Sequence, residues 1–71
     1  MTMTVSEKIR LIMKRNKVTM SDLADRSGQT RQNLSNKMSR NNFTEKDIST
    51  LAECLGCTAE VVFRFPDGTE V

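Results

Sequence analysis

Amide side chains gather in the segment RQNLSNKMS, residues 31 to 39. If this segment is a helix whose apolar pair, Leu34 and Met38, faces inward, three amides fall roughly opposite at about 100° per residue. These amides are Gln32, Asn33 and Asn36. A carboxamide can donate one hydrogen bond and accept another, which matches the N6 and N7 edge of adenine in the major groove. We therefore take the three amides as candidates for direct base readout, with an ordinary solvent face as the alternative.

Basic side chains accompany these amides, and they are distributed unevenly along the chain. Residues 1 to 42 hold nine basic and three acidic side chains, whereas residues 43 to 71 hold two and six, for a net charge of +2. Clustered Lys and Arg favour a polyanion because phosphate binding releases counterions. Arg31 and Lys37 could reach either a base or a phosphate, whereas Lys14, Arg15 and Lys17 could equally be plain solvated surface.

Cys54 and Cys57 have the C-x-x-C spacing of some metal and redox sites. A structural zinc site needs four ligands, and the chain has no histidine and no further cysteine, so one chain cannot complete it. Two chains could in principle assemble four thiolates, and a redox role needs a βαβ context that is lacking. The simpler interpretation is that both cysteines pack as small apolar residues. We therefore predict no metal and no cofactor.

Length and composition limit the classes of function. With 71 residues and 8.0 kDa, the chain has room for one domain and for no catalytic domain with a cofactor cleft. Histidine, the commonest general base, is absent, as are tryptophan and tyrosine, which stack on single-stranded nucleic acid. No apolar run approaches the roughly 20 residues of a membrane span. We expect a soluble, cytoplasmic, non-enzymatic single domain over residues 1 to 71.

The apolar spacing predicts four helices that would position the amide face, at residues 5 to 16, 20 to 27, 31 to 39 and 45 to 55. Four threonine or serine positions are suited to cap them: Thr4 or Ser6, Thr19, Thr30 and Thr44. Gly28 and Gly56 are suited to end the second and fourth helices, since glycine reaches the left-handed conformation without a Cβ penalty. The fold class is mainly all-α, a bundle of four to five helices over about residues 5 to 57.

The C-terminal tail, about residues 60 to 71, has a different pattern. Val61, Phe63 and Phe65 alternate with polar or smaller residues and predict a short strand, and the turn sequence Pro66-Asp67-Gly68 could return the chain as a hairpin. An isolated hairpin is weak in water, so the tail must pack on the helices or pair with a second copy. We keep both interpretations: the apolar strip closes the core beneath the first and fourth helices, or it contacts a second subunit.

Ala24, Gly28 and Leu34 have the spacing of a helix-turn-helix: a small residue where two helices cross, a positive-φ residue in the turn and an apolar anchor on the second helix. On these residues the chain resembles the helix-turn-helix family of phage repressors and Cro proteins, the xenobiotic-response-element type. The resemblance covers about residues 5 to 57 and is carried by Ile9, Ile12, Val18, Thr19, Leu23, Ala24, Gly28, Leu34, Ile48, Leu51, Ala52, Leu55 and Gly56.

The resemblance implies a small transcriptional regulator, most often a repressor of phage or mobile-element type, that binds double-stranded operator DNA as a homodimer with the helix at 31 to 39 in the major groove. With the charge distribution, it places a further set of residues near the DNA backbone: Ser21, Arg40, Asn41 and Asn42. The alternative is a protein-interaction module on the same fold, such as an antitoxin or an anti-repressor partner. The modest net charge keeps this alternative open.

Several positions depart from the family pattern. The turn residues Ser27 and Gln29 stand where the family often has aliphatic side chains, and Met20 replaces a glutamine that often touches phosphate. Met13 and Met38 occupy the positions of an arginine–glutamate ion pair frequent in the family. We expect these two methionines to contact each other, because replacing both members of a buried ion pair by apolar groups can be neutral or stabilising.

Overall fold

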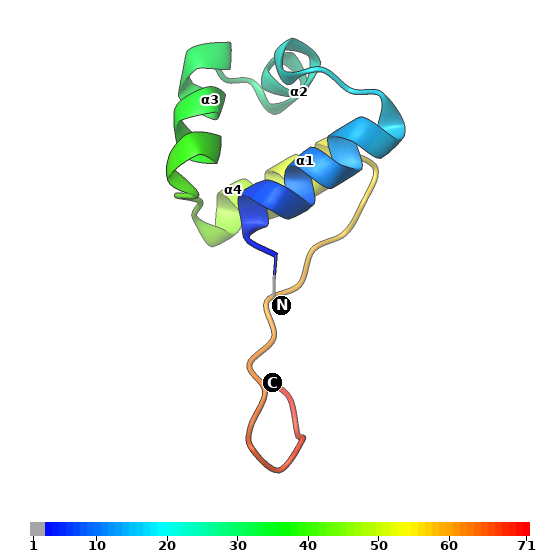
Figure 1. Ribbon diagram of the computed structural model, residues 1–71, viewed down its shortest axis with the longest axis vertical. Coiled ribbons are helices and arrows are strands. Elements are labelled where there is room, and N and C mark those ends of the chain that lie inside the picture. Colours follow the sequence, from blue (N-terminus) through cyan, green and yellow to red (C-terminus); the bar gives the residue numbers. More distant parts are fainter. Residues whose placement is uncertain (1–2) are drawn as a thin grey trace.

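A computed structural model describes residues 3–71 and contains four helices. They are α1 (Val5–Asn16), α2 (Met20–Ser27), α3 (Arg31–Arg40) and α4 (Glu45–Cys54). Each lies within one residue of its predicted bounds. The helix α4 packs on both α1 and α2, and α2 packs on α3, so that α2 and α3 lie over the α1–α4 pair (Figure 1).

Threonine N-caps set the start of every helix. In α1, α2 and α4 the threonine hydroxyl accepts the N–H of a carboxylate residue three positions on, and that carboxylate accepts the N–H of the threonine; the pairs are Thr4–Glu7, Thr19–Asp22 and Thr44–Asp47. In α3 the Thr30 hydroxyl accepts the N–H of Asn33, which has no carboxylate to return the bond. The sequence left open whether Thr4 or Ser6 caps α1; Thr4 is the cap, and Ser6 is buried inside the helix.

The hydrophobic core draws on all four helices. Its buried members are Ile9, Met13, Leu23, Ala24, Leu34, Met38, Leu51 and Leu55. The largest fully buried side chains are Leu23, Leu34 and Leu51, one each from α2, α3 and α4. Met13 and Met38, which we expect to contact each other, are both members of this cluster. The core therefore fixes the angle at which α3 lies on the bundle.

Side-chain hydrogen bonds tie the ends of the helices together. The Ser6 hydroxyl donates to the carbonyl oxygen of Met38 at 2.6 Å, and the Ser6 N–H donates to Oδ1 of Asn41 at 3.0 Å. At the other end of α1, Nδ2 of Asn16 donates to the carbonyl oxygen of Leu55 at 3.1 Å. Because these donors and acceptors belong to helix ends, they join the C-terminus of α3 to the start of α1, and the end of α1 to the C-cap of α4.

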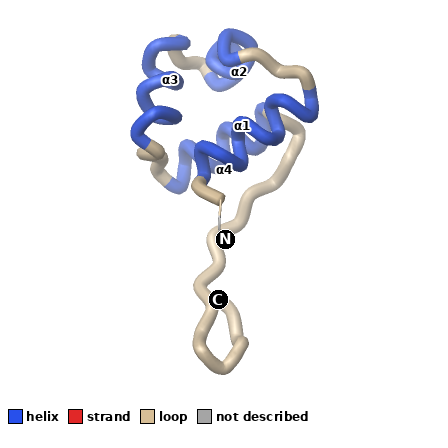
Figure 2. Tube along the Cα trace, in the orientation of Figure 1, coloured by secondary structure: helices blue, strands red, loops and turns tan. Residues whose placement is uncertain are grey.

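The C-terminal hairpin, residues 61–71, corrects two expectations. First, within residues 3–71 there is no strand, and the predicted strand is reduced to one isolated antiparallel bridge between Arg64 and Glu70. Second, the tail does not close the core: Phe63 and Phe65 are 69% and 50% exposed. The hairpin projects away from the helical body without a third strand or a packed face beside it, which a stable sheet requires (Figure 2).

Of the four to five helices expected, the described residues form four, and residues 58 to 60 after α4 are neither helix nor turn. Within the part of the chain that the structure describes, no helix is long and apolar enough to cross a membrane. The architecture is thus an all-α body of four helices from which the hairpin extends.

Candidate nucleic-acid interface

The connection between α2 and α3 is short because one residue turns the chain. Gly28 ends α2 with φ of 71°, and its N–H donates to the carbonyl oxygens of Ala24 and Asp25. A Cβ at this position would have open space around it, so the backbone angle alone is what requires glycine. Two residues later Thr30 already caps α3. Ala24 and Leu34 are buried on the two sides of this turn, as the helix-turn-helix spacing predicted.

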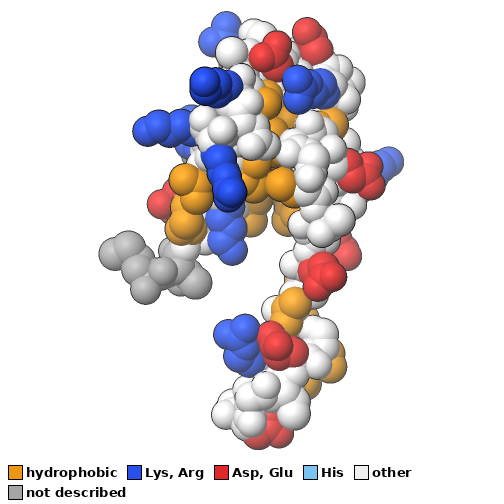
Figure 3. Space-filling view, turned by 90° about the vertical axis from the view of Figure 1, so that its right-hand side faces the viewer, with side chains coloured by type: hydrophobic (Ala, Val, Ile, Leu, Met, Phe, Trp, Pro, Cys, Tyr) orange, Lys and Arg blue, Asp and Glu red, His pale blue; other side chains and the backbone are white. Residues whose placement is uncertain are grey.

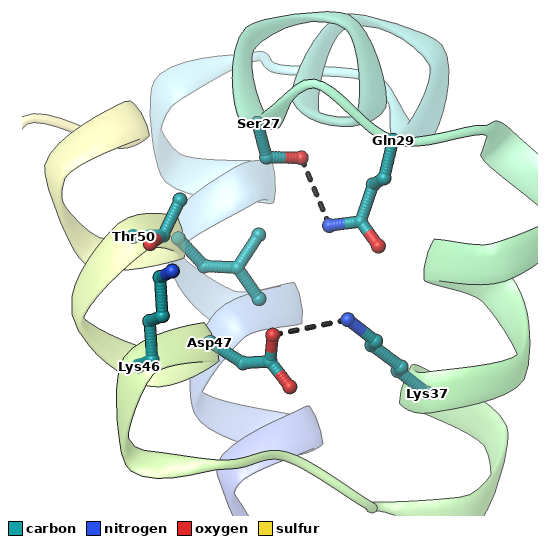
Figure 4. Close-up of a pocket in the computed structure, with 7 residues that line it drawn as sticks. Ser27, Gln29, Lys37, Lys46, Asp47 and Thr50 are labelled. Atoms are coloured by element: carbon teal, nitrogen blue, oxygen red, sulfur yellow. Dashed lines mark hydrogen bonds and ion pairs between the residues drawn. The ribbon is translucent and has the colours of Figure 1, made fainter.

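A network of polar side chains occupies the turn between α2 and α3. The family that the sequence resembles often has aliphatic side chains there. Nε2 of Gln29 donates to the Ser27 hydroxyl at 3.0 Å, and Nδ2 of Asn33 donates to Oε1 of Gln29 at 3.2 Å. The Ser27 hydroxyl in turn donates to the carbonyl oxygen of Leu23 at 2.7 Å. Figure 4 shows the Gln29 side chain directed toward Ser27. The polar side chains at the turn therefore hydrogen-bond to one another and to the backbone.

The outer side of α3 carries what we term the readout face, the exposed side chains of Arg31, Gln32, Ser35 and Asn36. Nε2 of Gln32 donates to Oδ1 of Asn36 at 3.2 Å. This bond uses the amino group of Gln32 and the carbonyl oxygen of Asn36. The Gln32 carbonyl oxygen and the Asn36 amino group form no hydrogen bond among the described residues, so they present an acceptor and a donor on the same side of α3.

Lys37 lies on the opposite flank of α3 from Ser35 and faces α4. Its ammonium is 3.0 Å from Oδ1 of Asp47, and the two side chains are 27% and 23% exposed. The Thr44 backbone N–H holds the pKa of Asp47 below its ordinary value, and the hydrogen bond from Lys37 lowers it further. The charge of Lys37 is therefore already compensated by an internal carboxylate.

A polar hollow of about 260 Å³ separates this flank from α4 (Figure 4). It is lined by Ser27, Gln29, Lys37, Lys46, Asp47, Thr50 and Leu51. Asn33 belongs to the same flank, because its side chain bonds to Gln29 at the rim of the hollow. Of the three predicted amides, Gln32 and Asn36 are hydrogen-bonded to each other, and Asn33, which bonds to Gln29, lines a second hollow together with Asn36.

The four residues expected near a DNA backbone fall at two ends of the α2–α3 unit. Ser21 is exposed in the first turn of α2, and Arg40 and Asn42 are exposed at the end of α3. Asn41 is the left-handed C-cap of α3 with φ of 50°, and its Oδ1 accepts from Ser6. Asn41 thus has a structural contact to α1 that the sequence did not indicate.

Ser35 was not among the sequence candidates, although it lines one hollow with Arg31 and Gln32. In the helical projection Ser35 and Lys37 are equivalent flanks of the amide face. The difference between them arises because α4 packs on one side of α3 and leaves the other open. Only the arrangement of the helices, which the projection does not contain, could have separated them.

The electrostatics of α3 differ from those of its neighbours. The helices α1, α2 and α4 each have an acidic residue in the first turn, whereas α3 has none. The positive end of the α3 dipole is therefore not offset by a carboxylate. Arg31 and Arg40, both exposed, make no ion pair among the described residues. This surface suits an anionic partner.

Neither cysteine lies in a cluster that could hold a metal. Cys54 and Cys57 are free thiols, each partly buried, and both pack against the core. Within residues 3–71 no group of three or more histidine, cysteine, aspartate or glutamate side chains has the arrangement of a metal site.

Comparison with known proteins gives one match. Residues 8–67 match the sequence model of a protein family described as the Cro/C1-type HTH DNA-binding domain. The matched span contains most of α1, the whole of α2, α3 and α4, and the first part of the C-terminal hairpin. No curated protein and no solved structure matches the chain.

Proposed function

The chain belongs to the Cro/C1-type helix-turn-helix DNA-binding family, a non-enzymatic family, and from this premise we propose that it is a small transcriptional regulator of the phage or mobile-element repressor type. It acts in the cytoplasm by occupying a specific duplex site. In this proposal α3 enters the major groove and reads base edges, while residues around it contact phosphates.

The pairing of Gln32 with Asn36 on the exposed side of α3 is the observation that carries this proposal. The donor and acceptor that the pair leaves unused complement the acceptor N7 and donor N6 of an adenine. Asn33 remains a candidate at the edge of this surface, and its existing bond to Gln29 would have to be shared or exchanged.

We assign the phosphate contacts to residues flanking the readout face. Arg31 and Arg40 offer charges that no carboxylate offsets, and Ser21 and Asn42 offer hydrogen-bonding groups at the two ends of the unit. Lys37 contributes less than its charge suggests, because a phosphate must compete with Asp47 for its ammonium. The Oδ1 atom of Asn41 already accepts a hydrogen bond from Ser6, so Asn41 contacts the DNA backbone only through its other polar groups.

We also propose that the chain binds DNA as a homodimer. One α3 can read only a few base pairs, and two-fold symmetric pairs of such helices read half-sites about one helical turn apart. The exposed apolar side chains of the C-terminal hairpin support self-association, since contiguous apolar surface is seldom left uncovered in a monomer.

Selection from random-sequence DNA with the full-length chain, followed by gel-shift titration, tests the proposal. We expect one enriched motif and a linear fall of log affinity with log salt concentration. The Gln32→Ala variant should relax the motif at one position, whereas Ser49→Ala, an exposed change on α4, should leave it intact. No enriched motif and no salt-sensitive binding would instead favour a protein-interaction module.

A further inference from the structure

The C-terminal hairpin has two chemically different faces. Phe63 and Val71 exchange both backbone hydrogen bonds, at 2.7 and 2.9 Å, and Phe65 donates its N–H to the carbonyl oxygen of Thr69. Residues directly opposite each other in such a pair share a face, so Phe63, Phe65 and Val71 lie together. Arg64 and Glu70 lie on the other face and form an ion pair of 3.0 Å. The hairpin is therefore amphipathic although it covers nothing.

The helical body carries an uncovered apolar groove of about 500 Å³ between α1 and α4. Its apolar lining comes from both helices and includes Val5, Ile9, Ile12, Ile48, Ala52 and Leu55. Figure 3 shows apolar side chains gathered on the helical body, with basic and acidic side chains around them, and the hairpin extending away from the body. This volume is in the range of pockets that enclose an apolar ligand or an anchoring side chain.

The groove and the hairpin of one chain do not cover each other. The chain follows the wall of the groove through Thr58, Ala59, Glu60 and Val61 and then leaves it. Beyond this point Phe63 and Val71 are 69% and 74% exposed. A two-stranded hairpin is at best marginally stable alone in water, so an apolar surface from elsewhere is needed to hold it.

The charges at these two surfaces nearly balance. The helix α1, which forms one wall of the groove, carries four basic side chains and one acidic side chain, whereas α4, the other wall, carries one basic and three acidic. One residue of each sign, Lys8 and Glu60, lines the groove itself. The hairpin, residues 61–71, carries Asp67, Glu70 and Arg64, and the last two are paired with each other. Docking of the hairpin in such a groove is therefore an apolar contact, with no strong charge repulsion against it.

We propose that each hairpin docks into the α1–α4 groove of a second copy of the chain, with Phe63 and Phe65 as the inserted side chains. The inference rests on the proposed homodimer and specifies its interface. A second copy fits because the chain itself supplies both the apolar hairpin and the groove, and a reciprocal exchange about a two-fold axis closes after two molecules. Both surfaces are then covered at once.

Docking also covers Cys57, whose free thiol lies at the groove. In a Cys54→Ala background, the alkylation rate of Cys57 becomes a measure of whether the groove is occupied. The rate should rise on dilution as dimers separate. A protection that does not change with concentration would mean that the hairpin folds back on its own groove, and this would overturn the exchange.

Sedimentation and light scattering of the full-length chain give the main test. We expect a concentration-dependent dimer, and the double variant Phe63→Ser, Phe65→Ser should raise its dissociation constant at least about tenfold, as loss of central aromatic anchors does. The variant Val62→Ser, also an apolar-to-serine change but outside the apolar face, serves as the matched control and should keep the dimer. Circular dichroism should report an unchanged helical body in all three.

A mixing experiment distinguishes exchange from simple edge pairing of hairpins. The groove variant Ala52→Arg and the hairpin double variant should each be monomeric, yet their mixture should dimerise because one intact hairpin then meets one intact groove. If Ala52→Arg fails to fold, Ile12→Gln replaces it. A wild-type chain that stays monomeric, or a mixture that does not recover, overturns the inference. DNA selection remains a separate readout: a motif bound by monomers contradicts only the exchange, whereas a dimer with no motif contradicts only the regulatory function.

Discussion

The readout face of α3 and the C-terminal hairpin are both exposed, but they leave different chemical groups without partners. The readout face offers amide and guanidinium groups above the buried anchors Leu34 and Met38. The hairpin offers Phe63, Phe65 and Val71 with no core beneath them. Polar groups are solvated at little cost until a partner arrives, whereas exposed apolar surface carries a free-energy cost until it is covered. The first surface suits DNA, and the second suits another protein surface.

The two regions also differ in how firmly they are held. Buried side chains, the Ser6 bonds at its C-terminus and the Lys37–Asp47 ion pair fix α3 on the bundle. The hairpin is connected to the body only by residues 58 to 60, which form no regular structure. Base readout needs a rigid placement of donors and acceptors, while an apolar anchor can adjust as it docks. The difference in attachment thus matches the difference in chemistry.

The largest expected effect is on the free energy of unfolding, which should respond strongly to a change in the core of α3 and weakly to one in the hairpin. Leu34→Ala removes a fully buried side chain, so the free energy of unfolding should fall by about 2–5 kcal/mol. Phe63→Ala, measured in the dilute monomer, should change it by less than about 0.5 kcal/mol, as for an ordinary surface site. Urea unfolding followed by circular dichroism measures both. Equal losses would mean that Phe63 packs on its own body.

The second largest effect should be on the discrimination between DNA sequences. Asn36→Ala removes one half of the Gln32–Asn36 pair, and discrimination at the base it reads should fall by about 1–3 kcal/mol. Competition gel shifts with single-base variants of the selected site measure this loss. Phe63→Ala should instead weaken binding to all sites alike, through dimerisation. If Asn36→Ala weakens every site equally, the residue is a backbone contact.

A smaller effect concerns the N-terminus of α3, the one helix with no acidic residue in its first turn. Asn33→Asp would give Thr30 the carboxylate partner that α1, α2 and α4 possess, and it would remove the solvent-exposed hydrogen bond from Asn33 to Gln29. On balance it should stabilise the fold by about 0.3–1 kcal/mol, because both groups of the lost bond can be solvated. The same carboxylate should lower DNA affinity, because it places a negative charge beside the phosphates. Thermal unfolding and gel shift should therefore move in opposite directions. An increase in both thermal stability and DNA affinity would mean that DNA does not bind at this end of α3.

The smallest effect is the pH dependence of the caps. Backbone N–H groups of Thr4, Thr19 and Thr44 hold the pKa values of Glu7, Asp22 and Asp47 below their ordinary values. A carboxyl whose pKa is lower in the folded chain stabilises the fold at neutral pH, and this contribution is lost as the pH falls below about 4.

Urea midpoints between pH 7 and pH 3 should therefore decrease, and Asp22→Asn should flatten the decrease. A control is offered by Asp25, which caps no helix, so that Asp25→Asn should leave the slope unchanged. An unchanged midpoint in the wild-type chain would contradict the role of these carboxylates.

The helices and their ends were predictable because their signals are local. Each helix cap accepts a hydrogen bond from the backbone N–H three residues further along the chain, as in Thr19, Thr30 and Thr44. Gly28 ends α2 because of its own positive φ angle. The amide face followed from the helical period, since Leu34 and Met38 mark the buried side. These features depend on residues within one or two turns of each other, which the sequence places together whatever the rest of the chain does.

The tertiary structure alone decided which flank of α3 is covered and where the C-terminal apolar strip goes. Lys37 and Ser35 are equivalent by helical period, and the packing of α4 makes the first an ion-pair partner and leaves the second open. The alternation of Val61, Phe63 and Phe65 defined a face but not what it meets. Both outcomes depend on contacts between segments far apart in the chain, and the hydrophobic effect that drives them has no directional preference for one apolar surface over another.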